Sequence, residues 1–232
     1  MAEKIKLSAG KIILSFIYIS VWPILLLVLS KDWLWVEGWI FSIWFLALCY
    51  ATIIYLYCKD PALLAERFKK PGTENQKRWD KYFVFGLVIA FTAWFVIMPL
   101  DAKRYGWTAN FSTWVKVTGG IILLPSSYLF FRSYVENTFL SPLVRIQAER
   151  KQQVVSSGVY GLVRHPMYLG AILFFIGTPM LLGSKYGILI GIILSLGIAG
   201  RIIGEEKMLL DELEGYGDYK KKVRYRLIPF IW

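Results

Sequence analysis

The chain has 232 residues, of which 56% are hydrophobic and 17% aromatic, and its mean hydropathy is +0.50. These values exclude an ordinary soluble domain and predict an integral membrane protein. The net charge is +11, but the basic residues lie in loops beside apolar segments, so they indicate membrane topology and contact with anionic lipid rather than nucleic-acid binding. Cys49 and Cys58 lack the spacing of a zinc site or a disulfide framework, so we expect no metal.

Six apolar segments are long enough, or nearly long enough, to cross a membrane as helices. They cover residues 12–29, 39–57, 83–100, 114–131, 168–182 and 186–203. Only Gly183, Ser184 and Lys185 join the last two segments, so we expect a tight antiparallel hairpin. Both of these segments are rich in glycine, which lets transmembrane backbones approach closely. The sequence thus predicts an all-α, polytopic helical bundle of about six transmembrane helices.

The polar segments suggest how this bundle is oriented. Residues 59–81 include one expected surface helix, over residues 62–69, and no residues that we expect to pair for chemistry. With six spans, 22 of the 27 Lys and Arg residues lie on the side that holds both termini, against 4 on the other. Basic residues concentrate in cytoplasmic loops, so this bias predicts that both termini face the cytoplasm.

Two polar clusters flank the predicted hairpin. The single histidine, His165, and Tyr168 lie at its start, while Arg201, Glu205 and Glu206 lie at its end. Charged groups at a membrane boundary are costly unless they pair or contact a ligand. A hairpin returns to the same membrane face, so groups about forty residues apart can share one cytoplasm-facing pocket. Two simpler interpretations stay open: a headgroup anchor for the R-H-P sequence, and an ion pair between Arg201 and Glu205.

A set of ordered strings adds to this interpretation: V-R-I-Q-A-E-R, V-V-S-S-G-V-Y, R-H-P-M-Y-L-G, R-I-I-G-E-E-K-M-L-L and a closing R-L-I-P-F. In these strings the chain resembles the isoprenylcysteine carboxyl methyltransferase family and, more distantly, membrane phospholipid methyltransferases. The resemblance covers roughly residues 137–232. We therefore predict an N-terminal part, residues 1–136, with four spans, and a methyltransferase-like part, residues 137–232, with the hairpin and the pocket.

The resemblance implies a membrane enzyme that binds S-adenosylmethionine without a Rossmann domain. The residues expected to border this cofactor are Gln147, Gln152, Gln153, Val154, Val155, Tyr160, His165, Pro166, Met167, Tyr168 and Glu206. The expected catalytic residues are Arg201 and Glu205, at the junction of cofactor and substrate. A prenylated or other lipid-like substrate would enter sideways from the bilayer. The membrane would be the cell membrane of a prokaryote or the endoplasmic reticulum of a eukaryote.

The chemistry of the acceptor stays open at this point. A carboxylate acceptor is already a nucleophile at neutral pH, and Arg201 would orient it through parallel N–H donors. An amine acceptor, as in a phospholipid N-methyltransferase, would need a carboxylate such as Glu205 to take its proton. Two further alternatives are an NADPH-dependent membrane sterol-type reductase, which shares the R-H-P-x-Y element, and a non-catalytic lipid-binding protein.

Overall fold

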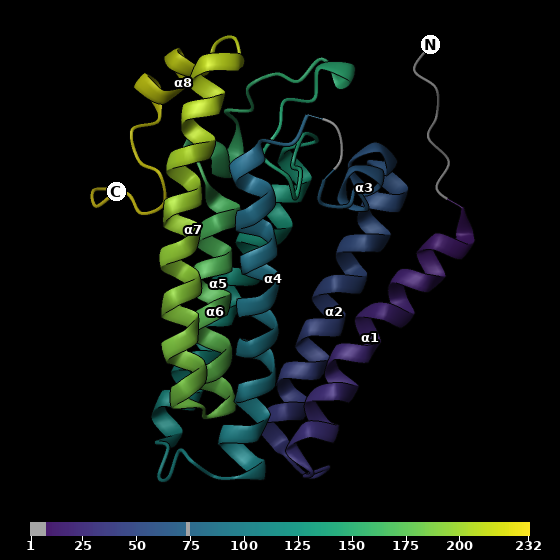
Figure 1. Ribbon diagram of the computed structural model, residues 1–232, viewed down its shortest axis with the longest axis vertical. Helices are drawn as coiled ribbons and strands as arrows, with labels where there is room; N and C mark the ends of the chain where they lie inside the picture. Colours follow the sequence, from purple (N-terminus) through teal and green to yellow (C-terminus); the bar gives the residue numbers. More distant parts are fainter. Residues whose placement is uncertain (1–7, 73–74) are drawn as a thin grey trace.

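The computed structural model describes residues 8–72 and 75–232, and this part of the chain is helical, with irregular loops and no strand. The long helices are α1 (Ala9–Ser30), α2 (Val36–Lys59), α4 (Arg78–Pro99), α5 (Thr113–Glu136), α6 (Pro166–Leu182) and α7 (Lys185–Glu212). The short elements are α3 (Pro61–Arg67), the π-helical turn η1 (Leu100–Arg104), the 3-10 turns η2 (Ala148–Arg150) and η3 (Gly158–Gly161), and α8 (Tyr216–Lys222). The long helices form one bundle, with α3 and α8 at the same end (Figure 1).

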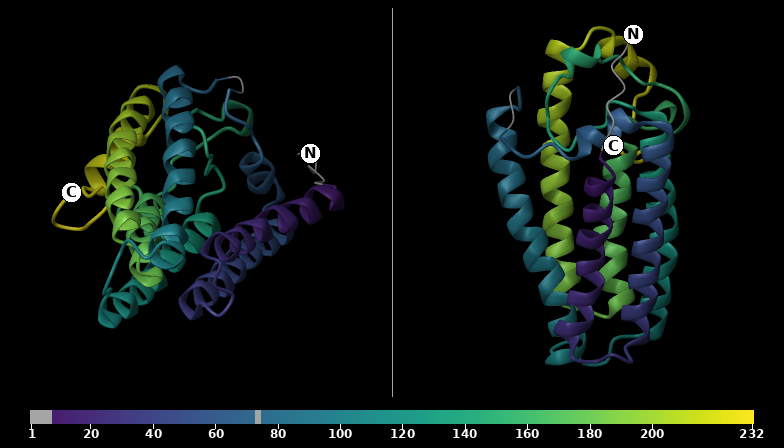
Figure 2. Two further views of the ribbon diagram at one scale, coloured as in Figure 1. Left: turned by 60° about the horizontal axis from the view of Figure 1, so that its bottom comes forward. Right: turned by 90° about the vertical axis from the view of Figure 1, so that its right-hand side faces the viewer.

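The bundle confirms the predicted all-α membrane fold. Five helices are long and apolar enough to cross a membrane, and α6 is a shorter apolar helix of 17 residues. At 1.5 Å per residue, α6 spans about 26 Å, slightly less than the hydrocarbon core. In contrast, α7 has 28 residues and continues nine residues past the predicted end of its apolar segment, so its last turns extend beyond the bundle's apolar part. The long helices run roughly along one axis (Figure 2).

Glycine allows α6 to lie close to both of its neighbours. A Cβ atom on Gly119 of α5 would lie 2.4 Å from the backbone nitrogen of Leu181, and one on Gly191 of α7 would lie 2.2 Å from the carbonyl oxygen of Phe175. Neither contact is sterically possible, so α5 and α7 approach α6 backbone to backbone at these points. The glycine-rich interface predicted for the hairpin is therefore present, although Gly200 has no such neighbour.

A short turn joins α6 to α7. Gly183 has a φ of 82° and its N–H donates to the carbonyls of Pro179 and Met180, which ends α6 in a left-handed cap. The next residue, Ser184, accepts a hydrogen bond from the N–H of Gly187 at 2.9 Å and so caps the start of α7. The predicted hairpin forms with only these two residues between its helices.

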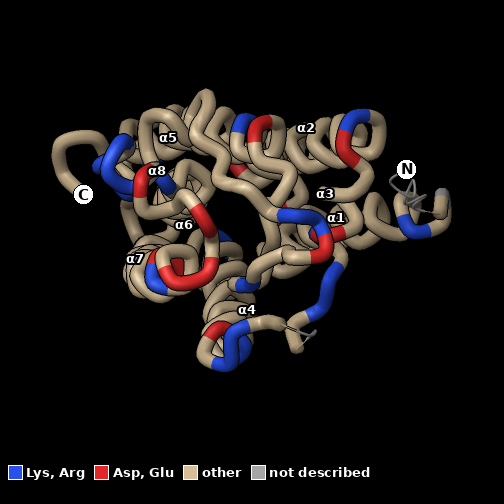
Figure 3. Tube along the Cα trace, turned by 90° about the horizontal axis from the view of Figure 1, so that it is seen from above, with Lys and Arg blue, Asp and Glu red and all other residues tan. Residues whose placement is uncertain are grey.

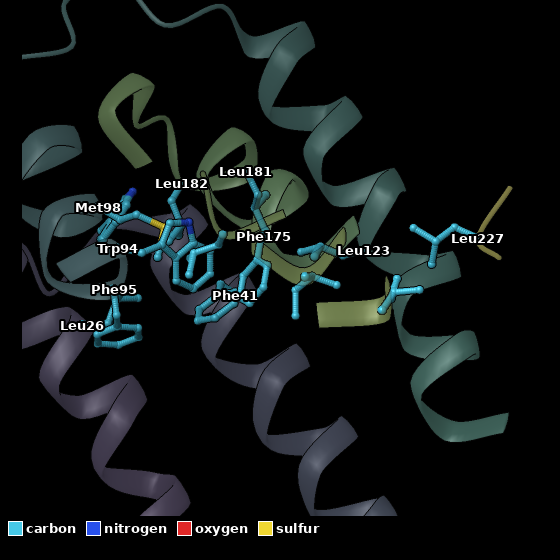
Figure 4. Close-up of a cluster of buried hydrophobic side chains, with 14 residues drawn as sticks. Leu26, Phe41, Trp94, Phe95, Met98, Leu123, Phe175, Leu181, Leu182 and Leu227 are labelled. Atoms are coloured by element: carbon cyan, nitrogen blue, oxygen red, sulfur yellow. The ribbon is translucent and has the colours of Figure 1, made fainter. Parts of the chain in front are cut away.

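The helices meet in one main hydrophobic cluster, which takes residues from every long helix (Figure 4). Trp94 and Met98 of α4 are fully buried in it, beside Phe175 of α6 and Ile202 of α7. Charged residues gather instead on the loops and helix ends at the α8 end, as the view from above shows (Figure 3). The apolar middle and the charged end match the two environments of a membrane boundary.

Candidate active site

A cavity of about 390 Å³ lies at the charged end of the bundle. Its walls come from α4, α5, α6, α7, α8 and the segment of residues 137–165, which we call the 137–165 loop. The polar part of its lining includes Arg164, His165, Arg201 and Glu205. The division of the chain after residue 136 stays a prediction, since α4 and α5 also contribute to these walls.

The α6–α7 hairpin brings the two predicted clusters together. The hydroxyl of Tyr168, in the first turn of α6, donates to Oε2 of Glu205 on α7 at 2.5 Å. His165 Nε2 lies 3.3 Å from Oε1 of Glu206, and the rings of His165 and Tyr168 stack with centroids 5.6 Å apart. Pro166 occupies the first turn of α6, where its missing N–H leaves no bond unmade.

The adjacent glutamates point to different places. Glu205 is half-buried and lines the cavity, whereas Glu206 is 2% exposed and lies behind its wall. Glu206 accepts hydrogen bonds from Nε of Arg164 at 2.7 Å and from Nε of Arg226 at 3.0 Å. Arg164 also donates to the backbone carbonyls of Val223 and Arg224. Glu206, which we predicted to border the cofactor, therefore holds three separate segments of the chain together.

Arg201 pairs with an unexpected residue. Its Nε donates to Oδ1 of Asp80 at 2.9 Å and its Nη2 to the carbonyl of Pro142 at 2.8 Å, so Arg201 forms its ion pair with α4 rather than the alternative one with Glu205. The guanidinium also lies over the ring of Tyr168, 5.8 Å from its centroid. Within the described chain its Nη1 has no hydrogen-bond partner, and Arg201 lines the cavity, so this group is available to a ligand.

Asp80 was missed by the sequence analysis, which expected no pairing in residues 59–81. It is fully buried in the first turn of α4 and also accepts from Nε2 of Gln76 and the N–H of Val144, both at 2.8 Å. The available signal was its position, because Asp80 is the only acidic residue between residues 75 and 100 and directly precedes an apolar run. A lone carboxylate at such a boundary requires a cationic partner.

A second buried ion pair in the same polar region has a structural role. Glu66 of α3 accepts from Nε and Nη2 of Arg145 at 3.0 and 2.9 Å, and both residues are almost fully buried. Burial alone would raise the pKa of Glu66, but the hydrogen bonds from Arg145, Lys69 and Ser141 outweigh it and hold the pKa below its ordinary value. This pair fixes the 137–165 loop to α3.

The 137–165 loop carries most of the predicted cofactor residues. Gln152, Gln153, Val154 and Val155 all line the cavity. Gln147 does not: it is fully buried, donates from Nε2 to the carbonyl of Phe139 at 2.6 Å, and its N–H donates to Oε1 of Gln152 at 2.8 Å. Gln147 therefore stabilises the 137–165 loop through hydrogen bonds outside the cavity, whereas Pro166 and Met167 line the cavity directly.

Buried tyrosines supply neutral polar groups to the cavity wall. Burial raises the pKa of Tyr160, Tyr216 and Tyr219, so all three stay protonated. The Tyr219 hydroxyl donates to the carbonyl of Tyr160 at 2.7 Å, whereas the buried hydroxyls of Tyr160 and Tyr216 have no hydrogen-bond partner among the described residues. Unsatisfied buried hydroxyls are uncommon in proteins.

Within residues 8–72 and 75–232, no group of three or more His, Cys, Asp or Glu side chains is arranged to hold a metal ion. The polar groups that face the cavity are instead a guanidinium, a carboxylate, an imidazole and tyrosine hydroxyls. This set suits an organic ligand that carries both a carboxylate and an amino group.

Comparisons with known proteins indicate the kind of enzyme to which this chain is similar. The family model described as phospholipid methyltransferase matches residues 119–217. Protein-S-isoprenylcysteine O-methyltransferase B of Arabidopsis thaliana is 27% identical over 157 residues, which cover 66% of this chain and 76% of the relative. The corresponding Saccharomyces cerevisiae enzyme is 39% identical over 93 residues, which cover 39% of this chain and 38% of that enzyme.

A solved structure shows the same fold. The eukaryotic intramembrane Ras methyltransferase, an isoprenylcysteine carboxyl methyltransferase, superposes with a TM-score of 0.57 at 22% identity, covering 92% of this chain and 74% of that one. These relatives are methyltransferases, which supports a methyl-donor enzyme over a sterol-type reductase. The chain is thus an integral membrane methyltransferase that is similar to the isoprenylcysteine carboxyl methyltransferases.

Proposed function

We propose that the cavity binds S-adenosylmethionine and that the enzyme methylates the carboxylate of a prenylated or similarly lipid-tailed substrate. The observation that carries this proposal is the position of Arg201, which lines the cavity together with Glu205 while Asp80 balances its charge. With Nε and Nη2 already bonded, its Nη1 is the group left to donate a charge-assisted hydrogen bond to a substrate carboxylate.

The fit of the cofactor rests on groups that lack partners or face the cavity. S-adenosylmethionine supplies a methyl group on a positively charged sulfur. The Glu205 carboxylate is suited to its ammonium group, and the ring of Tyr168 is suited to a cation. Tyr160 lines the cavity, and His165 is held by Glu206 in a fixed orientation at the cavity wall.

The apolar part of the lining supports a lipid-tailed substrate. Leu87 of α4, Phe130 of α5, Phe175 of α6 and Ile198 of α7 all line the cavity. Phe175 lies nine residues along α6 from Pro166, about 14 Å deeper in the bundle at 1.5 Å per residue. A substrate head beside Arg201 would therefore place its tail among these side chains, at membrane depth. Arg201 orients the carboxylate, and positioning of the reacting groups supplies much of the acceleration.

The bias of basic residues supports an active site on the cytoplasmic side of the membrane, as does the gathering of charge at the α8 end (Figure 3). This orientation holds for either host, the cell membrane of a prokaryote or the endoplasmic reticulum of a eukaryote.

A second candidate is N-methylation of an amine-bearing lipid. The match to the phospholipid methyltransferase model favours it, as does the half-buried Glu205, which is placed to accept a proton from an ammonium acceptor. In that case Arg201 would bind the lipid phosphate.

One experiment separates these functions. Purified enzyme in lipid nanodiscs is given radiolabelled S-adenosylmethionine and three acceptors that share one prenyl tail: a carboxylate, its carboxamide and an amine. We expect label only in the carboxylate, as a methyl ester. Label in the amine alone would support the second candidate. If S-adenosylhomocysteine does not raise the Tm and no acceptor or total membrane extract is labelled, the enzymatic proposal is wrong.

A further inference from the structure

The segment after α8, residues 223–232, folds back onto the hairpin as a closed loop, which we call the 223–232 loop. The N–H groups of Arg226 and Leu227 donate to the carbonyl of Trp232 at 2.8 and 3.0 Å, and the N–H of His165 donates to the carbonyl of Arg226 at 2.9 Å. The loop therefore lies at the level where α6 begins, beside the upper part of α7 (Figure 1).

One residue of this loop shows how deep it sits. Leu227 is 5% exposed and belongs to the main hydrophobic cluster of the membrane-spanning helices, together with Ile198 and Ile202 of α7 (Figure 4). A loop in the aqueous phase would not contribute to that cluster. The base of the 223–232 loop is thus packed against the apolar body of the bundle.

The tip of the same loop is apolar and uncovered. Ile228, Phe230 and Ile231 are 43%, 88% and 76% exposed. Phe230 also adopts a φ of 67°, a left-handed conformation that is unfavourable for a bulky side chain. Its only aromatic neighbour among the described residues is Tyr225, with ring centroids 5.2 Å apart, and most of the Phe230 ring stays exposed.

The surroundings indicate what covers this tip. The loop lies beside α7, which has an apolar surface of its own, with Leu196 and Ile203 68% and 57% exposed, as befits a helix in contact with lipid. The exposed basic residues Lys221 and Lys222 come immediately before the loop, and a third, Arg224, lies at its start. Basic residues next to exposed aromatic and aliphatic side chains are typical of segments that lie in the interface of an anionic membrane.

We propose that the 223–232 loop is an interfacial anchor, whose tip inserts among the acyl chains beside α7 while the preceding basic residues contact anionic headgroups. The anchor acts on the active site through Arg226. This residue donates to Glu206 and stacks on Trp232 with its guanidinium 5.0 Å from the ring centroid, and its carbonyl holds the backbone of His165. Contact with lipid therefore stabilises the wall that positions His165.

Spin labels test the anchor without reference to catalysis. In a Cys49→Ala, Cys58→Ala background, a nitroxide is attached at Phe230→Cys or, as a matched exposed control, at Lys221→Cys, and the protein is placed in bilayers that contain anionic lipid. Relaxation is measured with oxygen, which concentrates in acyl chains, and with a water-soluble nickel complex. We expect the label at position 230 to collide mainly with oxygen and the label at 221 mainly with nickel.

Two results would overturn the proposal. Equal nickel access at positions 230 and 221 would place the tip in water. Protection of position 230 from both reagents would mean that a protein surface covers it, such as a second copy of the chain. The contribution of the basic residues is tested in bilayers of phosphatidylcholine alone, in which we expect the label at position 230 to move toward water. If the depth of the label does not change, the basic residues do not contribute to the anchor. Neither readout depends on methyl transfer, so it is independent of the proposed function.

Discussion

Asp80, in the first turn of α4, binds Arg201, 121 residues later in α7, through a 2.9 Å hydrogen bond between Oδ1 and Nε. Both side chains are buried, and Arg201 faces the cavity. The first four helices therefore contribute more than a membrane scaffold, because one of them sets the position and charge balance of the expected substrate-binding group.

Replacing Asp80 with Asn should impair both stability and turnover. Removing one partner of a buried ion pair costs about 3–5 kcal/mol, because the remaining charge is left uncompensated. Misplacement of Arg201 by about 1 Å would lower kcat about 100-fold. Methyl-transfer kinetics and the Tm measure the two effects. Asp218→Asn, at an exposed carboxylate paired only with Lys221, is the control, and an Asp80→Asn enzyme with its normal kcat would show that Asp80 has no positioning role.

The two adjacent glutamates should respond differently to the same change. Glu206→Gln leaves Arg164 and Arg226 without a counter-charge, so we expect a loss of about 3–5 kcal/mol in stability and a clear drop in Tm. Glu205→Gln keeps an acceptor for Tyr168, so we expect a nearly normal Tm with strongly weakened cofactor binding or turnover. Thermal unfolding with and without S-adenosylhomocysteine measures both. Equal losses of Tm would contradict the division of roles between them.

Glycine substitutions on α7 test the packing of the hairpin. Gly191→Ala puts a Cβ where only 2.2 Å separates it from the Phe175 carbonyl, so α6 and α7 must move apart. Gly200→Ala, on the same helix, meets nothing within 4 Å and should stabilise α7 by up to about 1 kcal/mol through helix propensity. Thermal unfolding should therefore shift in opposite directions for the two variants, and a neutral Gly191→Ala would indicate a looser interface.

Acid should weaken the attachment of the 137–165 loop. The hydrogen bonds from Arg145 keep the pKa of Glu66 below its ordinary value of 4.5, although burial acts the other way. A carboxyl whose pKa is lowered by folding stabilises the protein fully above the unfolded pKa and loses this contribution as pH falls through the folded pKa. We expect the Tm to fall below about pH 4.5, more steeply in the wild type than in Glu66→Gln. Parallel curves would exclude a contribution from this pair.

The sequence predicted the parts of this molecule that depend on local pattern. Hydropathy located the membrane helices, and the short link at Gly183, Ser184 and Lys185 predicted the hairpin, so the meeting of Tyr168 with Glu205 was predictable, although the turn itself has only two residues. The partners of charged groups were not, because a carboxylate such as Asp80 or Glu66 pairs across helices that are far apart in the chain. The opposite directions of Glu205 and Glu206 also depend on the rotation of α7, which its apolar pattern fixes only roughly.

The hydrogen bonds around Glu206 have a consequence for the biosynthesis of the enzyme. Glu206 accepts hydrogen bonds from Arg164 and Arg226, and Arg164 also donates to the carbonyls of Val223 and Arg224. Val223, Arg224 and Arg226 are synthesised after α7. A nascent chain in which α1 to α7 are already inserted would still lack these hydrogen bonds. The wall that positions His165 is therefore completed only after residues 223–226 have been synthesised, later than all the helices from α1 to α7.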